Sequence, residues 1–291
     1  MAVANRLAPR TQKTGLTAYL TQDAVKDQIN KVVGGKNGTR FISSIVSAVQ
    51  ATPALQECTN SSILSAALLG ESSNLSPSPQ LGQYYMVPYD NRSKGAKEAQ
   101  FQLGYKGYIQ LATRSSQYKK LNVLSIKEGE LIRFDPLNEE IEVNLIQDDE
   151  QREAAPTIGY YAMFEYTNGF RKAMYWSRAK MEAHAKKYSP GYKRDLEKGT
   201  SWTFWAKDFD AMAYKTMLRQ LISKWGIMSI DLQDAIDSDM AVIREDGSRD
   251  YVETVQPDAV EEAAVPQEES AAVQEDDAAQ ETNDAAADFF S

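Results

Sequence analysis

Apolar residues recur with a helical period in three short stretches near the start of the chain. Thr21–Val33, Thr39–Gln50 and Ser61–Leu69 each place their aliphatic side chains three or four residues apart, on one face of a helix. Glycine or proline follows each stretch, as is typical where helices end. The pattern therefore predicts three helices, preceded by a flexible N-terminus over residues 1–20.

The hydrophobic period changes to two between about residues 83 and 176, which predicts strands. The predicted strands are Tyr84–Pro88, Ala99–Tyr105, Leu121–Ile126, Glu140–Leu145, Ile158–Tyr166 and Phe170–Trp176. The dipeptide Asn168-Gly169 predicts a hairpin turn between the last two, because it accepts the positive φ angle that such a turn needs.

Helical periodicity interrupts this run once, over Lys106–Ser116, and returns over Ser177–Lys187 and Ser201–Trp225. This order indicates an α+β fold: a small, mostly antiparallel sheet with a crossing helix, flanked by N-terminal and C-terminal helices.

The net charge of −9 averages two unlike parts of the chain. Residues 231–291 carry 19 acidic residues against two arginines, whereas residues 1–230 carry 30 basic residues against 22 acidic ones. A basic body is typical of a protein that binds a polyanion. Residues 236–291 contain few large apolar side chains, so we expect a disordered acidic tail after a single domain over residues 21–235.

The sequence offers little for covalent chemistry. Cys58 and His184 are the only residues of their types, and no GxxxxGK[ST] phosphate loop for ATP is present. The acids that could converge on a divalent metal, as in a nuclease, are Glu128, Glu130 and Asp135, or Asp208 and Asp210. Their positions beside hairpins and in a first helical turn favour solvated or capping roles. We therefore expect a protein that is not an enzyme and needs no cofactor, with Mg²⁺ binding left open.

Two observations bear on localisation. No stretch approaches the roughly 18 consecutive apolar residues that a membrane span needs, and the N-terminus lacks the apolar core of a secretory signal. We expect a protein of the bacterial cytoplasm that does not bind membranes.

Basic and aromatic residues are interspersed between residues 92 and 127, a segment that contains eight Lys and Arg residues and a single glutamate. Such cations can neutralise the phosphates of a nucleic-acid strand, and tyrosines offer its bases a surface. In the helix over 201–225, Lys215 and Arg219 fall on a flank outside the apolar stripe, where they could form a second wall. A solvated surface over an ordinary core explains both segments equally well.

Several spaced runs resemble the RecT family of single-strand annealing proteins. They are Tyr84–Pro88, Ala99–Arg114, Glu128–Glu130, Tyr175–His184 and Trp205–Ser229, and the resemblance covers about residues 15–235. It implies ATP-independent annealing of complementary strands by a homo-oligomer, a ring or a helical filament. It also implies binding to single-stranded DNA and the annealed duplex, a 5′-to-3′ exonuclease partner and a host single-strand-binding protein.

By motif position, the DNA-binding residues that the resemblance implies are Gln102, Tyr105, Lys106, Arg114, Lys207, Lys215 and Arg219. The basic and aromatic clusters add Tyr108, Lys119, Lys120 and Lys172 as candidates. A passive single-strand-binding protein, a metal-dependent nuclease and a structural phage protein remain alternatives.

Overall fold

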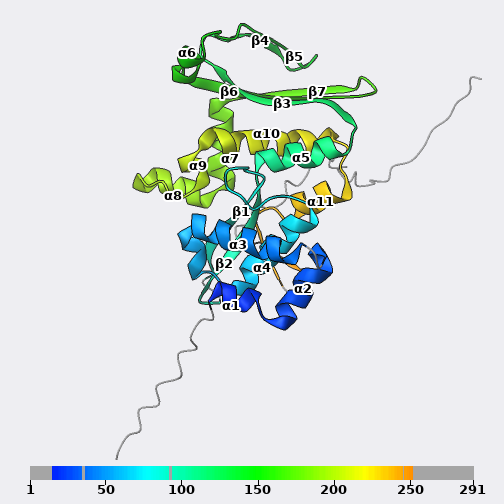
Figure 1. Ribbon diagram of the computed structural model, residues 1–291. Helices are drawn as coiled ribbons and strands as arrows, with labels where there is room; N and C mark the ends of the chain where they lie inside the picture. Colours follow the sequence, from blue (N-terminus) through cyan, green and yellow to red (C-terminus); the bar gives the residue numbers. More distant parts are fainter. Residues whose placement is uncertain (1–14, 35–36, 92–93, 245, 252–291) are drawn as a thin grey trace, which may run out of the picture. The chain divides into compact units, whose positions relative to one another are not determined.

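Helices come first along the chain, strands follow in the middle, and helices return near the end (Figure 1). The computed structural model describes residues 15–34, 37–91, 94–244 and 246–251. In chain order the elements are α1 (Leu16–Leu20), α2 (Asp23–Val33), α3 (Gly38–Ala51), the 3₁₀ helix η1 (Pro53–Glu57), α4 (Asn60–Ser72), β1 (Tyr84–Asn91), β2 (Ala96–Leu103), α5 (Tyr105–Arg114), β3 (Tyr118–Lys127), β4 (Leu131–Asp135), β5 (Glu140–Val143), α6 (Asp149–Ala154), β6 (Thr157–Tyr166), β7 (Arg171–Ser177), α7 (Arg178–Tyr188), α8 (Pro190–Lys198), α9 (Phe204–Lys207), α10 (Phe209–Trp225), α11 (Ile230–Asp237), β8 (Ala241–Ile243) and β9 (Arg249–Tyr251). The α+β class is confirmed.

The described strands form three small antiparallel sheets, with the orders β1-β2-β8-β9, β3-β6-β7 and β4-β5. β1 and β2 pair along their whole length, from Tyr84 opposite Leu103 to Asn91 opposite Ala96. The hairpin between β6 and β7 turns at Gly169, whose φ of 88° confirms the turn that the Asn-Gly dipeptide predicts.

Helices α5 and α10 lie between the β3-β6-β7 sheet and the N-terminal helices (Figure 1). Two sides of α10 are buried, and each side packs into a different hydrophobic cluster. Leu218 and Ile222 pack into the cluster of the N-terminal helices, whereas Met217 and Leu221 pack into the one beneath β6. The crossing helix α5, predicted from periodicity, packs against α10 and β3.

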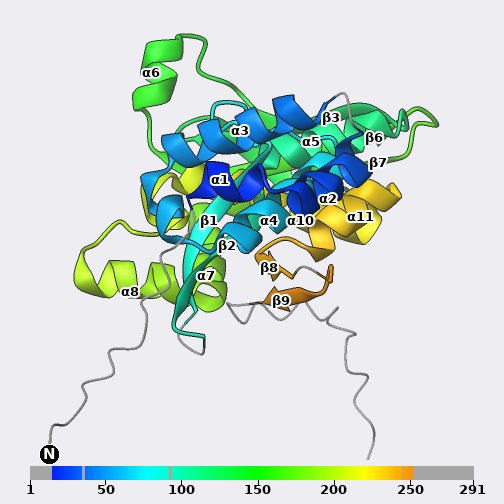
Figure 2. The same cartoon turned by 60° about the horizontal axis from the view of Figure 1, so that its bottom comes forward.

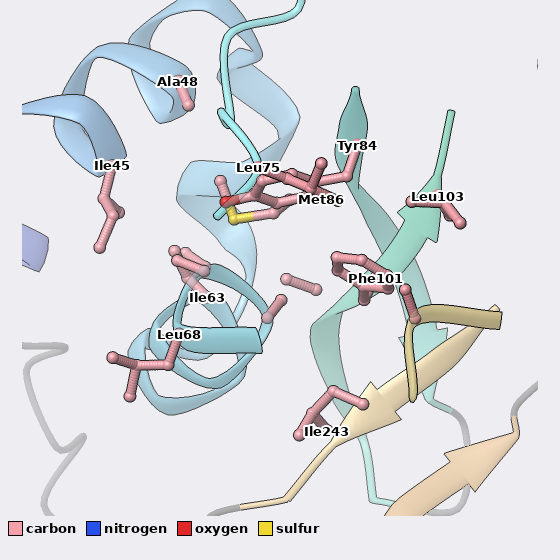
Figure 3. Close-up of a cluster of buried hydrophobic side chains, with 14 of the residues drawn as sticks. Ile45, Ala48, Ile63, Leu68, Leu75, Tyr84, Met86, Phe101, Leu103 and Ile243 are labelled. Carbon is pink, nitrogen blue, oxygen red and sulfur yellow. The ribbon is translucent and has the colours of Figure 1, made fainter. Parts of the chain in front are cut away.

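The N-terminal core forms where α4 meets β1 and β2 (Figure 3). The rings of Tyr84 and Phe101 are fully buried and stack with their centroids 5.2 Å apart. Gly70 on α4 makes this packing possible, because a Cβ atom there would lie 2.3 Å from the Tyr84 ring. On the other side, Ile243 of β8 covers the same cluster (Figure 3).

Both predicted domain boundaries need correction. Residues 16–20 form α1 rather than a flexible segment, and Leu20 is fully buried. Residues 238–251, predicted to belong to the disordered tail, instead contain β8 and β9, which extend the β1-β2 sheet (Figure 2). Ala241, Val242 and Ile243 are all buried. Three apolar residues are therefore enough to form a strand where the neighbouring strand β2 supplies the hydrogen bonds. Residues 1–14 and 252–291 lie outside the described residues.

The predicted helix over 201–225 is interrupted at Asp208. This residue has an extended backbone (φ −147°, ψ 81°), and its carboxylate accepts a hydrogen bond from the Ala211 N–H at 3.0 Å. It therefore ends α9 and caps α10. Across the described chain, no helix combines the length and hydrophobicity that a membrane crossing requires.

Candidate nucleic-acid interface

A pocket of about 200 Å³ opens where β2 ends and α5 begins, facing α9 and α10. Its lining residues are Tyr85, Gln102, Leu103, Gly104, Tyr105, Phe204, Lys207, Asp208, Ala211, Met212 and Lys215. Four of the sequence-predicted site residues therefore meet here, although about a hundred positions of sequence separate the two pairs. Gln102 and Tyr105 come from one wall, Lys207 and Lys215 from the other.

Glycines 104 and 107 shape the first wall, because the chain segment before β1 lies directly against the start of α5. A Cβ atom on Gly104 would lie 2.1 Å from the carbonyl oxygen of Gly82, and one on Gly107 would lie 2.1 Å from that of Gln83. The Gly104 N–H also donates to the Gln83 carbonyl at 2.9 Å. The Gly-Tyr-Lys-Gly run thus permits a close backbone approach that places Tyr85 and Tyr105 in the pocket.

Aromatic rings, Lys207 and the exposed residue Asp208 line the accessible part of the pocket, and Lys106 directly follows the lining residue Tyr105. Tyr85 packs against Phe204 at 5.6 Å, and Phe204 remains exposed. Lys106 and Lys207 are exposed, and neither ammonium lies within salt-bridge distance of any carboxylate in the described chain. The Lys207 ammonium lies 5.9 Å from the centre of the Phe204 ring. Flat rings beside lysines that form no salt bridge within the described chain suit a strand of bases and phosphates.

Lys215 lines the pocket but is an internal residue, contrary to its predicted place on an open flank. Its ammonium is 2.8 Å from Oδ1 of Asp239, and Nη1 of Arg219 is 3.3 Å from the other carboxylate oxygen. Asp239 is buried and also accepts the Leu103 N–H at 2.9 Å. Burial lowers the pKa of Lys215, and the charge of Asp239 opposes this effect. Asp239 therefore neutralises much of the positive charge that the sequence assigns to this wall.

Gln102 and Tyr108 are both buried. Gln102 lines the pocket, and its amide nitrogen donates to the side chain of the buried Gln100 at 2.8 Å. Tyr108 is 0% exposed within the N-terminal cluster. Its inclusion among the DNA-contacting residues is corrected here, because in this conformation the packed core separates its ring from any ligand.

Arg114 lies at the opposite end of α5 from the pocket. Nine residues separate it from Tyr105, which is about 13 Å along a helix. Its guanidinium donates at 2.6 Å to the carbonyl oxygens of Ser73 and Asn74, which follow α4. These two hydrogen bonds satisfy carbonyl groups at the end of that helix and give Arg114 a structural role.

The remaining basic candidates lie on the β3-β6-β7 sheet and pair with acids. Lys119 and Lys120 contact the two carboxylate oxygens of Glu165 at 2.6 and 3.5 Å. A register shift between Tyr118 and Lys120 allows both neighbours to reach the same carboxylate. Lys172 pairs with Glu139 and also lies 4.5 Å from the centre of the Trp225 ring. None of these three lysines lines the pocket.

Three of the acids considered for a metal site are held by other contacts. Glu130 is fully buried and accepts from Arg152 at 2.6 Å. Asp135 accepts from the turn residue Asn138, and Asp210 accepts the Tyr160 hydroxyl at 2.6 Å. Within the described part of the chain, no group of three His, Cys, Asp or Glu side chains has metal-binding geometry.

Comparison with known proteins agrees with the resemblance read from the motifs. Residues 39–257 match the model of the RecT family. The chain is 41% identical over 244 residues to the uncharacterized protein YqaK of Bacillus subtilis (strain 168), covering 83% of this chain and 76% of that protein. It is 27% identical over 239 residues to Protein RecT of Escherichia coli (strain K12), covering 81% of this chain and 84% of that protein. The family match spans well over half of the sequence, and this chain therefore belongs to the RecT family.

Proposed function

We propose that this protein binds single-stranded DNA along the pocket between β2–α5 and α9–α10, and anneals it to a complementary strand without ATP. One observation carries the proposal: the two motif runs meet in a single aromatic pocket that the exposed Lys207 lines and that the exposed Lys106 adjoins in the sequence. Family membership independently indicates a DNA-binding annealing protein of the phage recombination type.

The physical mechanism needs no nucleophile. Lys106 and Lys207 replace counterions at the phosphates, and the released ions make binding favourable at low salt. Tyr85, Tyr105 and Phe204 offer faces on which bases can stack. A strand held through its backbone keeps base edges free for a complement, and pairing then supplies the driving force.

The proposed contact set is smaller than the set predicted from sequence. Lys106, Lys207, Tyr105 and Gln102 remain as direct contacts. Lys215 and Arg219 support the wall through Asp239, and Arg114 supports the end of α4.

We propose further that the protein works as a homo-oligomer, because weak contacts on each copy then add along the strand. A 5′-to-3′ exonuclease that exposes single strands and a host single-strand-binding protein are the partners that we propose for this activity. Neither Mg²⁺ nor another cofactor enters the proposed mechanism.

An annealing assay with two complementary labelled oligonucleotides tests the proposal. In EDTA and without ATP, we expect faster annealing than in the absence of protein, with both strands recovered at full length. Lys106→Ala and Lys207→Ala should each reduce the slope of log affinity against log salt by about one. The matched control is Lys31→Ala, an exposed lysine on α2 remote from the pocket.

Three results would contradict the proposal. A requirement for ATP would reject the mechanism, and shortened strands in Mg²⁺ would favour a nuclease. Binding without any acceleration of annealing would leave a passive single-strand-binding protein.

A further inference from the structure

Trp202 is the most exposed aromatic side chain among the described residues, with 80% of its surface accessible. It lies on the short connection between α8 and α9. Trp205, three positions later, is instead buried and packs against Tyr192 and Phe209. The exposed indole therefore presents a flat apolar face to the solvent, with a polar N–H at its edge.

The connection that carries Trp202 is fixed by the buried carboxylate of Asp195. This group accepts hydrogen bonds from the Thr200 hydroxyl at 2.6 Å and from both the N–H and the hydroxyl of Thr203 at 2.8 Å. Burial alone would raise the pKa of Asp195, but these hydrogen bonds hold it well below its usual range. Thr203 in turn caps α9 by accepting the Ala206 N–H at 3.3 Å. The brace directs Trp205 into the core and holds Trp202 outside it.

Trp202 is close in the sequence to two residues that line the pocket, and basic residues outnumber acidic ones in this part of the chain. Phe204, two residues away, lines the pocket, and Lys207 follows one turn later. The exposed charges over residues 193–207 and beside the pocket are Lys193, Arg194, Lys198 and Lys207 against Glu197 and Asp208. An excess of two positive charges in the same segment as an exposed indole favours a polyanion with planar groups over an apolar protein surface.

We propose that Trp202 stacks on a nucleobase of the bound strand, next to the bases held at Phe204 and Tyr85. This inference rests on the proposed function and adds a specific contact beyond the pocket. Because the brace fixes the backbone on both sides of Trp202 before DNA arrives, little backbone entropy is lost when a base stacks on the indole.

Tryptophan emission and oligonucleotide anisotropy, measured in the same titration of the full-length chain with labelled oligo(dT), test the inference. Binding should quench the emission of the parent, and Trp202→Phe should lose most of the quenching while it binds within about threefold of the parent. Trp202→Ala should bind about tenfold more weakly, the equivalent of about 1.4 kcal/mol. Leu137→Ala is the matched control, since this 88%-exposed side chain lies on the turn between β4 and β5.

The possible outcomes separate this inference from the proposed function. If the parent binds oligo(dT) but Trp202→Ala binds equally well, or if quenching persists in Trp202→Phe, the stacking contact is rejected and the proposed function stands. If the parent itself does not bind, both are rejected. Sedimentation of Trp202→Ala as a smaller species than the parent would identify Trp202 as a contact between copies and overturn the inference.

Discussion

Replacement of Asp239 by asparagine removes one buried negative charge while it keeps the shape of the side chain. The amide oxygen can still accept the Leu103 N–H, which lies 2.9 Å from the carboxylate. Lys215 loses its ionic partner at 2.8 Å, and Arg219 loses its partner at 3.3 Å. The substitution therefore isolates the contribution of charge at the back of the pocket.

The expected loss in the free energy of unfolding follows from the burial of Lys215 and Asp239. The Lys215 side chain is 9% exposed and that of Asp239 0%. Removal of one partner of such a pair costs about 3–5 kcal/mol, because the other charge remains buried without compensation. Arg219 is 23% exposed and can turn toward water, so we expect the lower end, about 3 kcal/mol. For a domain of this size, that corresponds to a fall in Tm of about 6–12 °C.

Urea and thermal unfolding of the full-length chain measure this effect. Asp234→Asn is the matched control, because Asp234 pairs with Arg249 at 3.1 Å but is 60% exposed, and such surface pairs contribute about 1 kcal/mol or less. Addition of Lys215→Met to Asp239→Asn should recover much of the loss, since no buried lysine charge remains. Equal, small losses in the two single variants would refute this account of Asp239.

The pH dependence provides a second check with a defined sign. Burial places the folded-state pKa of Lys215 below its ordinary value of 10.5, so the folded state binds this proton less tightly than the unfolded state does. Loss of Asp239 deepens that shift. The stability deficit of Asp239→Asn should therefore narrow as pH rises toward 10.5.

Four further predictions concern other parts of the fold. Gly104→Ala should lower both Tm and DNA affinity, because its Cβ would lie 2.1 Å from the Gly82 carbonyl oxygen. Gly15→Ala is the control, since an added Cβ has no neighbour within 4 Å there. Equal Tm values for the two variants would contradict the close approach at Gly104. Arg114→Ala should lower Tm, because two hydrogen bonds at the end of α4 are lost, but it should leave the salt dependence of DNA binding unchanged. A weaker salt dependence in this variant would instead identify Arg114 as a phosphate contact. Burial raises the pKa of Glu130, but hydrogen bonds from Arg152 and from backbone N–H groups outweigh it and lower the pKa below 4.5. The ionised carboxylate therefore stabilises the fold above pH 4.5, and this stabilisation is lost as the pH falls below that value. Glu130→Gln should have a lower free energy of unfolding in urea at pH 7, and this free energy should depend less on pH in the acid range. Parallel dependence on pH in the parent and the variant would argue against this role. Truncation after Asp239 should impair folding by removing β8, whereas truncation after Tyr251 should preserve the circular dichroism spectrum and Tm; equal spectra for both would show that β8 is dispensable.

The local pattern of the sequence determined most elements of the fold. Periodicity located α2–α5, the long strands and α10, because amphipathic faces repeat at fixed spacing wherever one side is buried. It also missed β4, α6, α8 and α11. It failed for α1, β8 and β9, which are too short to show a period. Their apolar residues are buried only because distant elements cover them.

The sequence by itself also determined the motif runs, the basic character of the body and family membership, since these depend on residue identity alone. Only the tertiary structure decided which cations are available. Asp239 lies 24 positions from Lys215, and the carbonyl bound by Arg114 lies 41 positions away, so no local pattern could reveal either partner. The exposure of Trp202 depends in the same way on the buried Asp195, because burial and pairing are properties of the packed chain and not of spacing along it.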